Sequence, residues 1–283
     1  MKKRILCLLL ICAAFMLVPG AGADTEFSYA VLEDGTMEIK GQYGMEDNNY
    51  LELPWTIDGK DVTSIGLCAL SELNAVKIAL PPTLRKIDQW AFEVCQNLES
   101  ITLPHSMAEI VGNPFRCCQS LKSVYISPDH PVFAVIDGVL FNKEDKRLIC
   151  YPAGKEETSY TVPQGTRIIG EESLSCCDNL NHVEIPGSVK TIEAFAFAYC
   201  QNLQSISIAD GVESIGDEAF LYTPSLTRIN LPTSITMIHH EAFASRSTDL
   251  IVTVPRNSYA AQYCFENGIK YAYADENNDW LNN

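Results

Sequence analysis

The chain has 283 residues, with 36 acidic and 20 basic side chains and a formal net charge of −16 at pH 7. Binding to nucleic acid or to anionic lipid depends on clustered Lys and Arg, so this charge excludes both classes of partner. A chain of this length can bury a full core without covalent cross-links.

Residues 1–23 have the layout of a secretory signal. Lys2, Lys3 and Arg4 form a basic start, Ile5–Val18 is an uncharged apolar run, and Ala21-Gly22-Ala23 places small residues where a signal peptidase cleaves. The apolar run is too short to span a bilayer comfortably. We therefore expect cleavage after Ala23, no membrane insertion afterwards, and an exported chain whose formal charge falls to −19 because three basic residues leave.

Residues 24–64 lack the repeat described below and carry two alternating segments. Phe27–Leu32 and Met37–Lys40 flank Glu33-Asp34-Gly35, and Asp-Gly between alternating segments is typical of a β-hairpin. We interpret residues 24–64 as an N-terminal hairpin cap.

A regular repeat begins at Ile65. Its clearest signature is Ile, then a small residue four positions on, then Phe or Leu, with successive spacings of 22, 23, 59, 23, 23 and 23. The signature begins at Ile65, Ile87, Ile110, Ile169, Ile192, Ile215 and Ile238. Self-similarity at a fixed period is the mark of a solenoid.

A second signature runs in step with the first, and consists of two apolar residues separated by one. Such alternation predicts a short half-buried strand, which Pro can end without loss of an interior hydrogen bond. The second apolar positions are Leu53, Leu80, Leu103, Ile126, Val162, Ile185, Ile208, Leu231 and Val254.

Each unit is thus predicted to run from strand to Pro turn to Ile, and then through a helical or 3₁₀ turn that carries Ala-Phe. Such units bury their apolar sides only by stacking, with their strands paired in parallel. We predict an α/β solenoid over residues 65–255, right-handed, with coils of about 23 residues and one parallel sheet face, capped at both ends.

The spacing of 36 residues between Ile126 and Val162 indicates an insertion near residues 127–160. Within it, Phe133–Phe141 and Arg147–Tyr151 flank Asn142–Lys146, a pattern that predicts one hairpin grafted onto one coil.

The C-terminal end has its own pattern. Ser258–Asn267 is predicted to be a helix closed by Gly268, and Ile269–Ala274 would cover the last coil, so residues 256–274 form a C-terminal cap. Residues 275–283 form an acidic tail, whose Trp280-Leu281 could pack on the last coil or contact a partner.

Nine cysteines remain after the signal. Four of them, Cys95, Cys118, Cys177 and Cys200, lie three residues after the Phe or Leu of the first signature. Leu73, Thr223 and Arg246 occupy the same position in other coils, which favours a packing position for a small side chain. The alternative is a pair of disulfides between adjacent coils, Cys95–Cys118 and Cys177–Cys200.

Cys117-Cys118 and Cys176-Cys177 are not C-x-x-C motifs, so zinc has little support.

No motif of catalytic or metal chemistry stands out. His239-His240-Glu241 is the one histidine cluster, and it occupies a variable turn position that holds Gly216-Asp217-Glu218 in the preceding coil. The sequence has no H-E-x-x-H, no G-x-S-x-G and no phosphate-binding glycine loop. We expect no catalytic residue, no metal and no cofactor.

The sheet face is the remaining candidate site. Residues beside the inward apolar pair must point to the open face. They are Lys77/Ala79, Ser100/Thr102, Ser123/Tyr125, Ser159/Thr161, His182/Glu184, Ser205/Ser207, Arg228/Asn230 and Ile251/Thr253. Two interpretations stay open: Ser and Thr suit exposed strands in general, or the face binds a ligand by hydrogen bonds. The distinctive candidates for binding are Tyr125, His182, Glu184, Arg228 and Asn230.

The repeat resembles the BspA-type (Treponema-like) leucine-rich repeats of bacterial surface and secreted proteins. The resemblance is clearest in Ile185–Ile206, which reads IPGSVKTIEAFAFAYCQNLQSI, and extends to the inserted Asp137–Gly154 and the closing Val254–Tyr273. It covers about residues 50–274, and it is specific for the fold but only weakly specific for function.

The resemblance implies adhesin-like binding of host or matrix components. We therefore expect a non-catalytic, monomeric, secreted or cell-surface protein of bacterial type, which recognises a protein or glycan through the sheet face or the inserted hairpin. The alternatives are a scaffold of the cell envelope without a specific ligand and, with no motif in its favour, a hydrolase.

Overall fold

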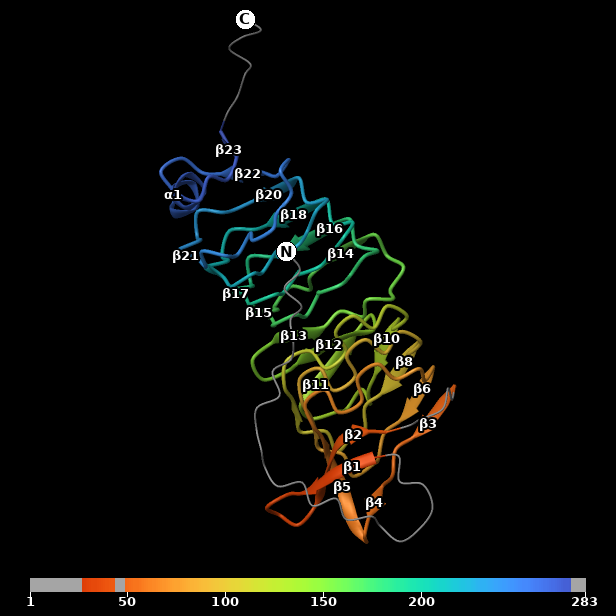
Figure 1. Cartoon of the computed structure of the whole chain (residues 1–283). Helices are drawn as coiled ribbons and strands as arrows, with labels where there is room; N and C mark the ends of the chain where they lie inside the picture. Colours follow the sequence, from red (N-terminus) through yellow and green to blue (C-terminus); the bar gives the residue numbers. More distant parts are fainter. Residues whose placement is uncertain (1–26, 44–48, 276–283) are drawn as a thin grey trace, which may run out of the picture.

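The computed structural model describes residues 27–43 and 49–275. It forms an elongated stack of coils that runs from a hairpin at the N-terminal end to a short helix at the other end (Figure 1). The predicted signal peptide of residues 1–23, and Trp280-Leu281 of the predicted tail, lie outside the described residues.

The strands of the second signature form one face of the stack, which we call the first face. They pair in parallel with their equivalents in the neighbouring coils, as Val183 does with Ile206. They are β3 (Tyr50–Glu52), β6 (Lys77–Ala79), β8 (Ser100–Thr102), β10 (Ser123–Tyr125), β14 (Ser159–Thr161), β16 (His182–Ile185), β18 (Ser205–Ile208), β20 (Arg228–Asn230) and β22 (Ile251–Val254). The predicted fold class and the coil length are confirmed.

Each coil also makes a second short strand that the sequence analysis did not predict. It contains the Ile of the first signature, and it pairs in parallel with its equivalents, as Ile192 does with Ile215. These strands are β5 (Lys60–Ile65), β7 (Lys86–Ile87), β9 (Glu109–Ile110), β15 (Ile168–Ile169), β17 (Thr191–Ile192), β19 (Ser214–Ile215) and β21 (Met237–Ile238).

The Ala-Phe segment after each second strand is a turn rather than a helix. The turn is tight because two residues in it take left-handed backbone angles, as Phe195 (φ 55°) and Tyr199 (φ 62°) do. It drives the Phe side chain into the core, where Phe197, Phe220 and Phe243 stack with ring centroids 5.6 and 4.9 Å apart. Burying one such ring stabilises the fold by about 1.5–3 kcal/mol.

The insertion is a three-stranded antiparallel meander and not the single hairpin predicted. Asp137-Gly138 takes left-handed angles (φ 50° and 81°) and breaks the expected strand Phe133–Phe141 into two. The strands are β11 (Phe133–Ile136), β12 (Val139–Asn142) and β13 (Arg147–Cys150), and β13 continues in parallel with β15.

This meander divides both sheets of the solenoid. On the first face, one sheet runs from β3 to β10 and a separate sheet runs from β14 to the C-terminal end. The continuous face expected from the sequence is therefore two faces, with the meander between the halves (Figure 1).

The side chains of the meander lie in two hydrophobic cores. Val139 and Leu148 pack into the C-terminal core, whereas Leu140 and Ile149 pack into the N-terminal core.

Both ends of the described chain are covered. β1 (Phe27–Val31) and β2 (Met37–Gln42) pair antiparallel around Asp34, which accepts hydrogen bonds from the backbone and hydroxyl of Thr36. β2 then pairs in parallel with β5, which also pairs antiparallel with β4 (Thr56–Ile57).

At the other end, α1 (Tyr259–Glu266) begins at Ser258, whose side chain accepts from Ala261 N–H, and Gly268 follows the helix with φ +60°. β23 (Tyr271–Tyr273) then adds a parallel strand to β22. Within the described ranges, no helix has both the length and the apolar character needed to cross a bilayer.

Candidate functional site

The repeated cysteine position serves packing. Cys95, Cys118 and Cys200 are buried free thiols, and each donates a hydrogen bond to a carbonyl of the preceding coil, at 3.3, 3.0 and 3.0 Å. Cys177, the fourth of them, is also a buried free thiol, and burial raises its pKa well above the usual value. The packing interpretation is confirmed, and the alternative disulfides Cys95–Cys118 and Cys177–Cys200 are wrong.

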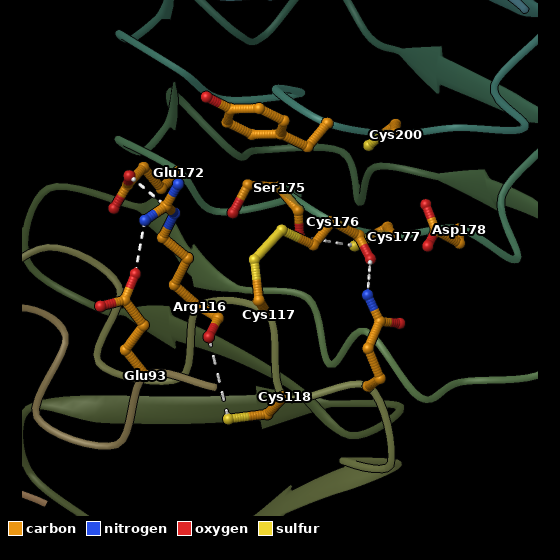
Figure 2. The surroundings of a disulfide bond; sticks show 12 residues. Glu93, Arg116, Cys117, Cys118, Glu172, Ser175, Cys176, Cys177, Asp178 and Cys200 are labelled. Atoms are coloured by element: carbon orange, nitrogen blue, oxygen red, sulfur yellow. Dashed lines mark hydrogen bonds and ion pairs between the residues drawn. A yellow bond between two sulfur atoms is a disulfide. The ribbon is translucent and has the colours of Figure 1, made fainter. Parts of the chain in front are cut away.

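A different disulfide joins Cys117 to Cys176, whose Cα atoms lie 5.2 Å apart (Figure 2). This disulfide was not predicted. The two cysteines occupy equivalent positions, because each directly precedes a packing cysteine. Their separation of 59 residues, one coil plus the spacing of 36 across the insertion, gave no sign that their turns would be neighbours.

The disulfide lies where the backbone ladder between coils is interrupted. In regular coils, the turns of neighbouring coils are joined by backbone hydrogen bonds. For example, Leu174 N–H donates to Ala196 O at 2.9 Å. Among the described residues, no backbone hydrogen bond joins residues 113–117 to residues 172–176. Side chains link them instead: Asn113 Nδ2 donates to Glu172 O at 2.9 Å, and Gln119 Nε2 donates to Cys176 O at 3.1 Å.

A buried carboxylate stabilises the same junction. Glu172 is only 4% exposed, and it accepts from Trp90 Nε1 and pairs with Arg116 Nε at 3.1 Å. Desolvation raises the pKa of Glu172, although the bond from Trp90 and the charge of Arg116 oppose this shift. Arg116 also pairs with Glu93 (Figure 2). These partners lie on three neighbouring coils, so the cluster ties the two halves together.

The five predicted binding residues do not form one site. Tyr125 lies on β10, in the N-terminal sheet, whereas the other four lie on β16 and β20 of the C-terminal sheet. The meander separates the two groups.

On the C-terminal sheet, the polar side chains largely bind one another. His182 Nδ1 lies 2.8 Å from Ser205 Oγ, and Glu184 accepts from Thr161 Oγ1 at 3.0 Å and lies 3.6 Å from His182 Nε2. Asn230 is used within the sheet, since its amide bonds both the N–H (3.1 Å) and the carbonyl (2.6 Å) of Ile208. Arg228 remains exposed. Among the described residues, the side chains of Ser159, Ser207, Arg228 and Thr253 have no hydrogen-bond partner, so this face is satisfied only in part.

The N-terminal sheet is hollowed instead. A groove of about 380 Å³ lies over β3, β6 and β8. It is lined by Tyr50, Lys77, Ile78, Ala79, Leu80, Pro82, Ser100, Thr102 and Pro104. The side chain of Ala79 is a single methyl group, which leaves this space open. The equivalent position of β16, in the C-terminal sheet, carries the larger Glu184. We call this hollow the N-terminal groove.

Tyr50, at one end of the groove, is 58% exposed. The sequence analysis listed the strand that ends at Leu53 but did not assign its outward residues, so Tyr50 was missed. The irregular spacing from Leu53 to Leu80, longer than in the regular coils, concealed the pairing of Tyr50 with Lys77 that the structure shows.

The histidine cluster lies against neighbouring carboxylates. His239 Nδ1 lies 2.6 Å from Asp217 Oδ1, and His240 Nε2 lies 3.3 Å from Glu241 Oε1. In residues 27–43 and 49–275, no group of three or more His, Cys, Asp or Glu side chains is placed to hold a metal ion.

Several solved structures are similar to this chain. A leucine-rich repeat protein from Eubacterium ventriosum aligns with 82% of this chain and 76% of its own, at 18% identity and a TM-score of 0.54, which supports the common fold. A leucine rich cell surface protein from Faecalibacterium prausnitzii aligns with 93% of this chain and 97% of its own, at 19% identity and a TM-score of 0.45. The pneumococcal vaccine antigen PcpA aligns over 89% and 98%, at 18% identity and a TM-score of 0.48. A comparison with curated proteins found no match.

A family model described as the BspA type leucine rich repeat region matches residues 49–144 and 151–272 in six copies. The match covers most of the chain and coincides with the stacked coils. The chain therefore belongs to the BspA-type leucine-rich repeat family.

Proposed function

We propose that this protein is a non-catalytic binding protein, secreted or held at the bacterial cell surface, which recognises a protein or glycan through its N-terminal sheet face. The observation that carries the proposal is the N-terminal groove, with its exposed Tyr50 and small polar residues. Concave sites that combine apolar and aromatic contacts with a few polar groups are where proteins bind ligands.

Two further features support the proposal. Tyr125 lies on β10 of the same sheet and is also exposed, and solvent-facing aromatic residues are enriched at recognition surfaces. Extended solenoid faces are binding surfaces in other repeat proteins. The signal-like pattern of residues 1–23 supports export.

The test is an array of glycans and extracellular-matrix proteins probed with the chain from residue 24 onward. Ala79→Gln fills the groove, and Ser207→Gln places the same side chain at the equivalent position of the C-terminal sheet as a matched control. We expect the first variant to lose the captured ligand and the second to keep it. Equal binding by both variants would remove the groove from consideration.

The second candidate, an envelope scaffold without a specific ligand, makes a different prediction. It requires tight retention in the cell-wall fraction and no array ligand that depends on the N-terminal sheet. Recovery of the protein only from culture supernatant counts against it.

A further inference from the structure

The N-terminal groove has the dimensions of a site for a small ligand. Its volume of about 380 Å³ falls within the range of roughly 300–1,000 Å³ that is usual for such pockets. A protein partner of standard size buries about 800 Å² on each side. Such an interface involves about 20–30 residues on each side, whereas nine residues line the groove.

The polar side chains of the groove have no hydrogen-bond partner among the described residues. This holds for the hydroxyls of Ser100 and Thr102, and for the ammonium group of Lys77, which alone can donate three hydrogen bonds. Ser205 and Thr161 of the C-terminal sheet, by contrast, already have side-chain partners. A ligand with many hydroxyl groups would fit these donors and acceptors.

The floor and one end of the groove are apolar. Ala79, Leu80 and Pro82 form part of the lining, and the exposed Tyr50 stands at the end. A pyranose ring has an apolar C–H face and a rim of hydroxyls, so it can stack on an aromatic ring while its rim is hydrogen-bonded. The groove carries this same division between apolar and polar groups.

The net charge of the chain argues against a polyanionic ligand for the groove. Among the described residues that line it, Lys77 is the single charged one, and the chain around it carries a formal charge of −16. A polyanion would be repelled at long range and would find one cation on arrival. An uncharged ligand avoids this long-range repulsion.

The backbone argues against an extended peptide. Peptides that bind to sheets usually add a strand at an open edge. β6 and β8, which form the floor, are interior strands with neighbours on both sides in the order β10-β8-β6-β3. Their backbone groups are used by the sheet, so specificity must come from side chains.

We propose that the N-terminal groove binds a short, uncharged oligosaccharide, with one sugar ring stacked on Tyr50 and its hydroxyls bonded by Lys77, Ser100 and Thr102. This inference rests on the proposed binding function and narrows its ligand to one chemical class.

The experiment is titration of the chain from residue 24 onward with maltotriose, cellotriose and chitotriose, measured by calorimetry and saturation-transfer NMR. An array of neutral and uronic-acid oligosaccharides extends the range of probes. We expect at least one neutral saccharide to bind. Tyr50→Ala and Ala79→Gln should each weaken it roughly tenfold or more, as loss of one aromatic contact or of the space would require.

Matched variants separate stacking from a loss of folding. Tyr50→Phe keeps the ring and should keep most of the affinity. Tyr222→Ala removes another tyrosine, 50% exposed on the turn side of the coil, and should leave binding unchanged. Circular dichroism of each variant verifies that the coils are intact.

Four outcomes would overturn the inference. Preferential binding of the uronic-acid sugars, or sugar binding unaffected by Tyr50→Ala, would contradict it directly. A matrix protein whose capture depends on the groove, with no saccharide bound, would reject the sugar and leave the binding function intact. If no array ligand depends on the groove, both proposals fail.

Discussion

The sheet from β3 to β10 and the sheet from β14 to β23 are built from the same coil, yet they present different faces. In the C-terminal sheet, His182, Glu184 and Asn230 are held by hydrogen bonds within the sheet. In the N-terminal sheet, Ala79 leaves a hollow beside Tyr50. The buried positions of the coil maintain the fold, whereas the outward positions are free to differ, so a binding site can arise in one half without cost to the stack.

The packing of the two halves differs as well. Phe220 is stacked on both sides, by Phe197 and Phe243, whereas Phe92 has one ring neighbour among the described residues, Phe115 at 5.5 Å. The N-terminal stack of rings ends at the junction, where the disulfide and the Glu172 cluster are placed. The following predictions test these differences, from the largest effect to the smallest.

Phe220→Ala should be the most destabilising of these changes. Phe220 is fully buried, and truncation of such a ring lowers the free energy of unfolding by about 3–5 kcal/mol. Phe92→Ala should cost less, because one stacked neighbour is lost instead of two. Urea unfolding followed by circular dichroism measures both. A larger cost for Phe92→Ala would contradict the contrast between the halves.

Loss of the disulfide should weaken the junction between the halves. Cys117→Ser with Cys176→Ser removes the covalent link across 59 residues of sequence, with an expected cost of about 2–4 kcal/mol. The backbone ladder cannot compensate, since it is interrupted there. Urea unfolding with and without dithiothreitol is the measurement. The reductant should destabilise the native chain and leave the double variant unchanged, and a native chain insensitive to it would refute the prediction.

Asn230→Ala separates a structural role from a binding role. The amide of Asn230 bonds Ile208 at two places, so its removal should lower the free energy of unfolding by about 1–2 kcal/mol. Binding at the N-terminal groove should not change. A loss of ligand affinity without a loss of stability would instead support a binding role for Asn230.

His130 should make stability depend weakly on pH. It is buried at the start of the insertion, and its Nδ1 accepts from the N–H groups of Val132 and Phe133 at 3.2 and 3.1 Å. Desolvation first, and then the charges of His105 and Lys143, lower its pKa below the usual 6.5, while Asp129 acts in the opposite direction. Below pH 6.5 the unfolded chain therefore binds more protons than the folded chain.

The contribution of His130 should accordingly be complete above pH 6.5 and decline as the pH falls through that value. The slope cannot exceed about 1.4 kcal/mol per pH unit for one group. Urea unfolding from pH 8 to pH 5 should show the slope in the native chain and a smaller one in His130→Gln, which keeps an acceptor but does not titrate. Identical slopes would exclude His130 as the cause.

Much of the fold could be predicted because its causes are local and repeated. Ile192 and Phe197 have equivalents in every regular coil, since each coil must bury the same side chains against its neighbours. Ser258 and Gly268 mark the ends of α1 by the backbone geometry that they favour. The packing role of Cys95 followed from finding Leu73 and Thr223 at the same position.

Tertiary structure alone decided which coils meet across the insertion. That contact sets Cys117 against Cys176, ends the first sheet at β10, and places Tyr125 apart from His182. It also turned a predicted hairpin into a meander shared by two cores. Periodicity determines what a coil buries, but it carries no information about which partner an interrupted coil will find. The junction and the N-terminal groove both depend on such long-range contacts, and for that reason only the folded chain revealed them.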